Sequence, residues 1–145
     1  MEQSRQDLIH QINYLSKETD ELYHRSSLKF NMSDTVSIVL YTIYDVGEDC
    51  LLSDVYKNSG ISRQTVNSAI RKLEAEEMLY LEPYRGRSKK IVLTERGRDY
   101  MNRTAARLFA AEMAAFDTWT QEEIRTYTGL MEKHLACLRR EIDKL

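Results

Sequence analysis

Apolar positions recur at helical spacing along most of this chain. Within residues 60–79, Val66, Ala69, Ile70 and Leu73 fall on one side of a predicted helix, with Ser62 suited to cap its start. The other side of the same helix is polar and carries Arg63, Gln64, Asn67, Ser68 and Arg71. Such a two-faced helix predicts one side packed on a core and one side free to touch a partner.

Similar stripes and capping residues predict further helices. They are residues 3–25, a helix starting at Ser33 and Asp34, a short helix 54–58 capped by Ser53, a helix from Glu95 to about Phe116 capped by Thr94, and a last helix starting at Thr120. A Ser59-Gly60 turn separates the short helix from the helix that starts after Ser62, so the two form a helix-turn-helix candidate.

A β-hairpin is predicted directly after this unit. Residues 79–82 and 91–93 read as short strands, and PYRGRSKK between them holds four basic residues and no acidic one. The expected fold class is therefore mainly α with a small β-hairpin, a winged helix-turn-helix with additional helices at both ends.

Composition narrows the class of protein. A length of 145 residues, 42% hydrophobic content and a single proline suit one folded, mostly helical domain. No apolar run reaches 18 residues and the N-terminus does not resemble a signal peptide, so we expect a cytoplasmic protein with no membrane span. The sequence has no phosphate loop, nucleophile elbow or metal-ligand spacing, so we expect no enzyme, no cofactor and no metal site.

Charge is unevenly distributed although the net charge is only −2. The segment from Lys57 to Arg107 holds twelve basic and six acidic residues, whereas the rest of the chain holds nine and seventeen. A basic middle between acidic ends favours an anionic partner for the middle, and ordinary surface charge is the alternative.

Both ends of the chain carry apolar stripes. Their positions are Leu8, Ile12, Leu15, Thr19 and Leu22 near the N-terminus, and Ile124, Tyr127, Met131, Leu135, Leu138, Ile142 and Leu145 near the C-terminus. Two long striped helices exceed what a small central module needs, which favours a homodimer over packing on the chain's own core.

From Leu52 to Gly97 the chain resembles the MarR family of bacterial winged-helix transcriptional regulators. The matching segments are LSDVYKNSGIS, RQTVNSAIRKLEAEEML and GRSKKIVLTERG, the last containing an LTxxG element. The resemblance implies a single MarR-like domain over residues 1–145, with a DNA-binding lobe at 33–100 and dimerisation helices at 1–30 and 101–145. It also implies a homodimer on a pseudo-palindromic operator, with a small aromatic effector as a further partner.

The resemblance and side-chain chemistry together indicate the DNA contacts. The predicted DNA-binding residues are Ser62, Arg63, Gln64, Thr65, Asn67, Ser68, Arg71, Arg85, Arg87, Lys89 and Lys90. Arginine can bond guanine, asparagine or glutamine can bond adenine, and the short hydroxyls suit phosphate oxygens. Arg87 matches the wing arginine that enters the minor groove in similar proteins.

Three positions depart from the family pattern. Arg85 stands where an aspartate is common, Glu77 where a glycine commonly follows the recognition helix, and Tyr56 where many helix-turn-helix units keep a small residue. No effector residue is assigned, although aromatic and apolar residues at Tyr14, Tyr23, Tyr41, Tyr44, Met101 and Trp119 could line a cleft or simply fill the interior.

Two other functions compete with operator binding. One is a winged helix that binds proteins and not DNA, and the other is a regulator of the same fold that senses oxidation through Cys50 or Cys137. Neither cysteine has a redox or metal spacing, so we expect both thiols to be dispensable for DNA binding.

Overall fold

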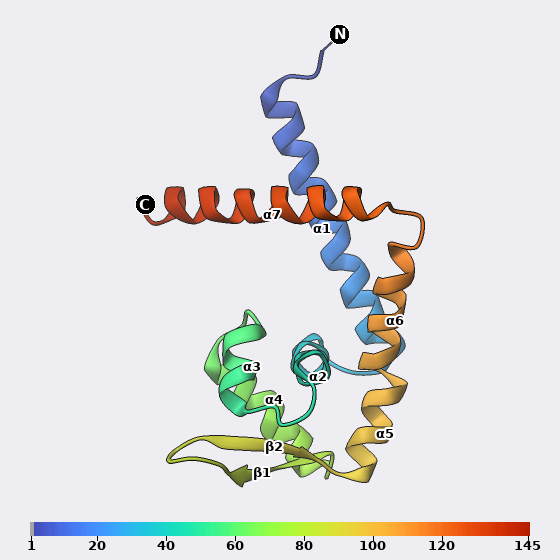
Figure 1. Ribbon diagram of the computed structural model, residues 1–145, viewed down its shortest axis with the longest axis vertical. Helices are drawn as coiled ribbons and strands as arrows, with labels where there is room; N and C mark the ends of the chain where they lie inside the picture. Colours follow the sequence, from blue (N-terminus) through green and yellow to red (C-terminus); the bar gives the residue numbers. More distant parts are fainter. Residues whose placement is uncertain (1) are drawn as a thin grey trace. The chain divides into compact units, whose positions relative to one another are not determined.

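The computed structural model describes residues 2–145, which belong to two compact units, one ending at Phe109 and the other covering Ala110–Leu145. The elements in chain order are α1 (Arg5–Lys29), α2 (Asp34–Val46), α3 (Leu52–Asn58), α4 (Arg63–Ala75), β1 (Leu79–Pro83), β2 (Lys89–Leu93), α5 (Glu95–Arg103), α6 (Ala105–Ala115) and α7 (Gln121–Ile142) (Figure 1). The predicted fold class, mainly α with one hairpin, is confirmed.

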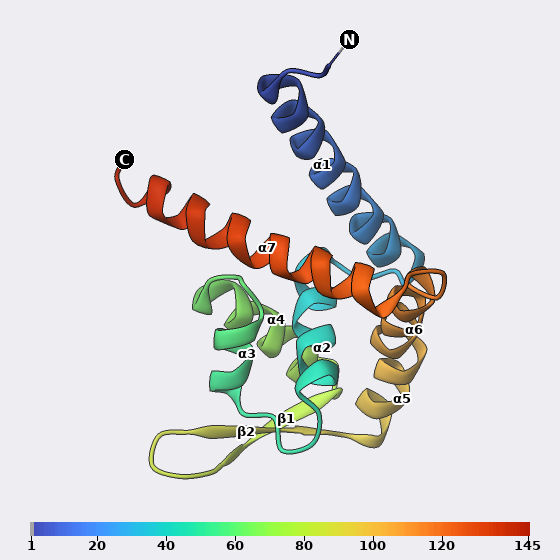
Figure 2. The ribbon, with the colours of Figure 1, turned by 45° about the horizontal axis from the view of Figure 1, so that its top comes forward.

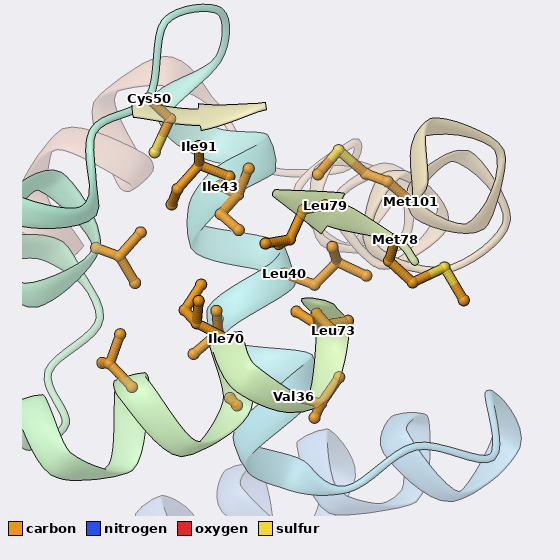
Figure 3. Close-up of a cluster of buried hydrophobic side chains, with 14 of the residues drawn as sticks. Val36, Leu40, Ile43, Cys50, Ile70, Leu73, Met78, Leu79, Ile91 and Met101 are labelled. Carbon is orange, nitrogen blue, oxygen red and sulfur yellow. The ribbon is translucent and has the colours of Figure 1, made fainter. Parts of the chain in front are cut away.

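The core of the first unit forms around α2, which contacts α1, α3, α4 and α5. The predicted apolar stripe of α4 is buried, with Val66 and Leu73 fully inaccessible to solvent. Figure 3 shows this stripe meeting side chains of α2 and the hairpin, among them Leu40, Ile43 and Leu79. Each fully buried aliphatic side chain of this kind contributes roughly 1.5–3 kcal/mol, so the core fixes α4 firmly and leaves its other face exposed.

Four predicted helix caps are confirmed. Ser33, Ser62, Thr94 and Thr120 each accept a hydrogen bond from a backbone N–H of the first turn of α2, α4, α5 and α7. The predicted cap at Ser53 is wrong. The short helix starts at Leu52, two residues before the predicted start. Leu51 is its N-cap, because the Asp54 carboxylate accepts a hydrogen bond from the Leu51 backbone N–H at 2.9 Å and so closes the first turn there.

Two predicted helix boundaries are wrong as well. The first helix continues to Lys29, because the hydroxyls of Ser26 and Ser27 bond back to the Tyr23 carbonyl and do not interrupt the helix. The predicted continuous helix from Glu95 to Phe116 is divided at Thr104, which has φ −124° and ψ −83°. The buried Thr104 hydroxyl bonds the Tyr100 carbonyl at 2.8 Å, an interaction that often bends helices.

The hairpin pairs β1 with β2 in antiparallel register from Leu79 opposite Leu93 to Pro83 opposite Lys89. Both strands are longer than predicted and take in Pro83, Lys89 and Lys90. The backbone N–H of Ile91 also bonds the Cys50 carbonyl at 2.9 Å, which ties β2 to the α2–α3 connection. Figure 2 shows the loop of the hairpin at its far end from α5, so the basic loop projects from a fixed base.

Within residues 2–145 no helix combines the length and apolar character that a membrane span requires.

Candidate nucleic-acid interface

The polar face of α4 lies opposite its buried stripe. Arg63, Gln64, Ser68 and Arg71 are exposed, and Thr65 and Asn67 are half-buried. The predicted helix residues are therefore all presented by one helix whose position is fixed by its apolar side.

The three short hydroxyls of this helix already have intramolecular partners. Ser62 Oγ accepts from the Thr65 backbone N–H at 3.2 Å and lies 2.7 Å from Thr65 Oγ1. Ser68 Oγ donates to the Gln64 carbonyl at 3.1 Å. Ser62 thus caps the helix, and the hydroxyls offer fewer free groups to a phosphate than the sequence suggests.

Tyr56 of α3 contacts two of the predicted recognition residues. Its hydroxyl donates to Asn67 Oδ1 at 2.5 Å, and the Arg63 guanidinium carbon lies 4.9 Å from the centre of its ring. The Asn67 amide and the Arg63 guanidinium are thus restrained by a residue of the preceding helix. Sequence reasoning noted Tyr56 only as a departure from the family pattern, since a contact between two helices gives no periodic signal.

The wing loop is a tight turn. Gly86 adopts φ +57°, the Tyr84 N–H bonds the Ser88 carbonyl at 3.0 Å, and the Ser88 N–H bonds the Arg85 carbonyl at 2.9 Å. Arg87 is exposed at this turn, while the Arg85 guanidinium carbon lies 5.6 Å from the centre of the Tyr84 ring. The turn holds both arginines at the end of the hairpin.

The two wing lysines differ in their surroundings. Lys89 is exposed, whereas Lys90 Nζ lies 2.6 Å from Asp49 Oδ1 in the α2–α3 connection. The hydrogen bond and charge of Asp49 raise the pKa of Lys90 above its ordinary value. Lys90 therefore anchors the base of the wing, a role that sequence reasoning missed because Asp49 precedes it by 41 positions.

A cavity of about 530 Å³ lies behind the wing, between the C-terminal end of α2, β2 and α5. Its wall includes Tyr44 and Met101, two of the residues that the sequence suggested for a cleft, and the charged side chains of Glu48, Lys90 and Arg98. This volume falls in the range of small-molecule sites.

The described residues 2–145 contain no cluster of three or more His, Cys, Asp and Glu side chains that could hold a metal ion.

Solved structures with the same fold include a MarR family regulator from Neisseria meningitidis, with a TM-score of 0.81 and 14% identity over 94% of this chain and 97% of that one. This chain has the MarR winged-helix fold. The S. aureus MepR–DNA complex matches with a TM-score of 0.66 and 20% identity, over 94% of this chain and 99% of that chain.

A third MarR-like fold belongs to Bordetella bronchiseptica BpsR, whose DNA binding is regulated by 6-hydroxynicotinic acid. It matches with a TM-score of 0.63 and 20% identity, over 86% of this chain and 98% of that chain. No protein-family model and no curated protein matches the sequence. At these identities the comparisons establish the MarR fold of the chain, and its DNA contacts stay predictions.

Proposed function

We propose that this protein is a DNA-binding transcriptional regulator that acts as a homodimer on a pseudo-palindromic operator. The observation that carries the proposal is the exposed polar face of α4 beside an arginine-bearing wing, in a fold that S. aureus MepR uses in a complex with DNA. An α-helix fits the major groove of B-DNA, and a basic hairpin suits the adjacent minor groove.

The polar face of α4 and the wing differ in side-chain chemistry, so we assign them different parts of the DNA contact. Arg63, Gln64, Asn67 and Arg71 carry donors and acceptors that can address base edges. Arg85 and Arg87 carry charge at the hydrogen-bonded turn and Lys89 at the start of β2, so the three suit the phosphate-lined minor groove. Lys90 contributes less to DNA in this proposal because Asp49 already neutralises it.

A dimer is supported by the apolar side chains that each unit leaves in water. Leu15 in α1 is 54% exposed and Leu135 in α7 is 57% exposed. Contiguous apolar surface of this kind is typical of a protein interface. Two-fold symmetry of the dimer would then be mirrored in half-sites about one helical turn apart.

A small aromatic effector is the third part of the proposal. The cavity behind the wing has a suitable size for such a ligand. Its wall includes Lys90 and Asp49, the ion pair that ties the base of the wing to the α2–α3 connection. A ligand there would act by changing the equilibrium between wing or lobe positions. Release of bound operator by 6-hydroxynicotinic acid, and its loss in Tyr44→Ala, would support this site.

Selection of bound sites from random duplex DNA tests the function directly. We expect an inverted repeat. Arg87→Ala should then weaken binding to operator and random duplexes by a similar factor and reduce the salt slope by about one unit, because it removes one phosphate-neutralising charge.

Lys17→Ala is the matched control, since Lys17 is an exposed cation on the face of α1 opposite Leu15. It should leave both affinity and salt slope unchanged. If no duplex is enriched, the protein is better described as a winged-helix module that binds other proteins.

A further inference from the structure

Tyr56, Asn67 and Arg63 form a contact group, here named the Tyr56 clamp, that joins α3 to the polar face of α4. The hydroxyl of Tyr56 donates to Asn67 Oδ1 at 2.5 Å, and the Tyr56 ring lies 4.9 Å from the Arg63 guanidinium carbon. Arg63 and Asn67 are one helical turn apart, so a single ring on α3 restrains two neighbouring side chains.

The hydrogen bond changes what Asn67 can recognise. An asparagine reads adenine with both ends of its amide, because Oδ1 accepts from the adenine N6 amino group while Nδ2 donates to N7. Here the Tyr56 hydroxyl takes one of the two Oδ1 lone pairs, whereas both Nδ2 hydrogens stay available. The Asn67 amide is thereby biased from a balanced donor and acceptor toward donation.

The Arg63 guanidinium stays protonated in proteins, so it can only donate hydrogen bonds, and its geometry matches the acceptors O6 and N7 of guanine. Stacking on Tyr56 restricts this flexible side chain before DNA arrives, which lowers the entropy cost of the contact. The clamp therefore presents two adjacent donors toward the groove.

We propose that Tyr56 is a positioning residue that makes Asn67 and Arg63 a mainly donating pair, so that this turn of α4 prefers guanine to adenine in the half-site. The inference rests on the proposed DNA binding and specifies its base preference. A guanine edge presents only acceptors at N7 and O6, and it complements such a pair better than adenine, whose N6 amino group finds only the one Oδ1 lone pair that Tyr56 leaves free.

The test compares base preferences after selection from random duplex DNA with the full-length protein, Tyr56→Phe and Asn67→Ala. Asn67→Ala identifies the base step that Asn67 reads. At that step the wild type should prefer guanine, and Tyr56→Phe should lower the guanine-to-adenine ratio at least about five-fold, because the Oδ1 lone pair that Tyr56 held becomes free to accept from adenine.

Three controls separate this role from a structural one. Tyr80→Phe removes a hydroxyl from another half-exposed tyrosine and should leave the profile unchanged. Tyr56→Phe should have no further effect in the Asn67→Ala background, since the two act as one unit. Tyr56→Ala, which also removes the ring beside Arg63, should extend the loss of preference to a second base step.

The outcomes distinguish the two proposals. If the wild type enriches a site and Tyr56→Phe keeps its guanine preference, or weakens all sequences equally, the clamp does not set specificity and the inference is overturned while DNA binding stands. If the wild type enriches no site, DNA binding itself fails and the base preference fails with it. Thermal melting of each variant confirms that Tyr56→Phe, which keeps the ring, is folded.

Discussion

The thiol of Cys50 illustrates how burial decides the chemistry of one residue. Cys50 is 2% exposed, and burial, with a smaller effect of the Asp54 charge, raises the pKa of its thiol to about 11. Its Sγ lies 3.6 Å from the Leu51 carbonyl. Because the thiolate is the reactive form, Cys50 is poorly suited to the oxidation-sensing role that the sequence left open.

Alkylation should separate the two cysteines. At pH 8 we expect Cys137, which is half-buried on α7, to react with iodoacetamide well before Cys50, and both to react in urea. Mass spectrometry of the modified peptides measures the two rates, with Cys137→Ser isolating the slow site. Equal rates in the native protein would mean that Cys50 is accessible and would restore it as a sensor candidate.

Glu77 occupies a position that favours glycine. It has φ +59° in the residue after the C-cap of α4, where the Glu77 N–H bonds the Glu74 carbonyl at 3.0 Å and the Met78 N–H bonds the Leu73 carbonyl at 2.9 Å. This is the Schellman arrangement, in which a side chain at the left-handed residue is costly.

Glu77→Gly should therefore raise the free energy of unfolding by about 1 kcal/mol, since it relieves that strain. Urea denaturation measures the change. Glu76→Gly is the control, because Glu76 has φ −86° and gains nothing from glycine. A destabilised Glu77→Gly variant would indicate that the glutamate side chain makes a stabilising contact.

At the scale of elements, Gly97 explains why the LTxxG sequence matters to the wing. A Cβ on Gly97 would lie 1.7 Å from the Met78 carbonyl oxygen, the same oxygen that accepts the Thr94 N–H at 3.0 Å. The first turn of α5 therefore packs directly on the backbone that joins α4 to β1. This close approach fixes the hairpin relative to the recognition helix.

Gly97→Ala should destabilise the protein by at least about 2 kcal/mol, because backbone and not a flexible side chain must move. Gly129→Ala is the matched control within α7, where an added Cβ meets nothing within 4 Å and should stabilise the helix by up to about 1 kcal/mol. Thermal melting of the two variants measures both effects, and a neutral Gly97→Ala would remove this account of the motif.

The elements that the sequence predicted well are those governed by local interactions. The caps at Ser62 and Thr94 and the buried stripe of α4 depend on residues within one or two turns, so their patterns are visible along the chain. The Lys90–Asp49 pair and the Tyr56 clamp depend on tertiary packing. The helix and hairpin that carry the candidate residues were therefore predictable, and the DNA contacts of those residues stay predictions, whereas the restraints on Asn67 and Lys90 were not visible in the sequence.

At the scale of the whole molecule, the helices at both ends of the chain expose apolar side chains. Side chains of α1 and α7 such as Leu8, Ile12, Leu138 and Ile142 are each close to half exposed in the single chain. Contiguous apolar surface of this kind is typical of a protein interface, and in the homodimer proposed above a second copy of the same chain would cover it.

A single charged residue on α7 can test this without truncating the protein. Leu135 is 57% exposed and lies in line with Met131 and Leu138, so in a monomer Leu135→Lys would place a lysine in water at little cost. In a dimer that covers this face, the same change buries an unpaired charge, and we expect dissociation at micromolar concentration. Sedimentation velocity measures the change.

Thr126→Lys, on the opposite side of α7, adds the same charge and should leave the dimer intact. A wild type that sediments as a monomer, or a Leu135→Lys variant that remains dimeric, would show that α7 does not supply the subunit contact. Loss of operator binding in Leu135→Lys alone would link the terminal stripe to the recognition helices, because one lobe can hold only one half-site.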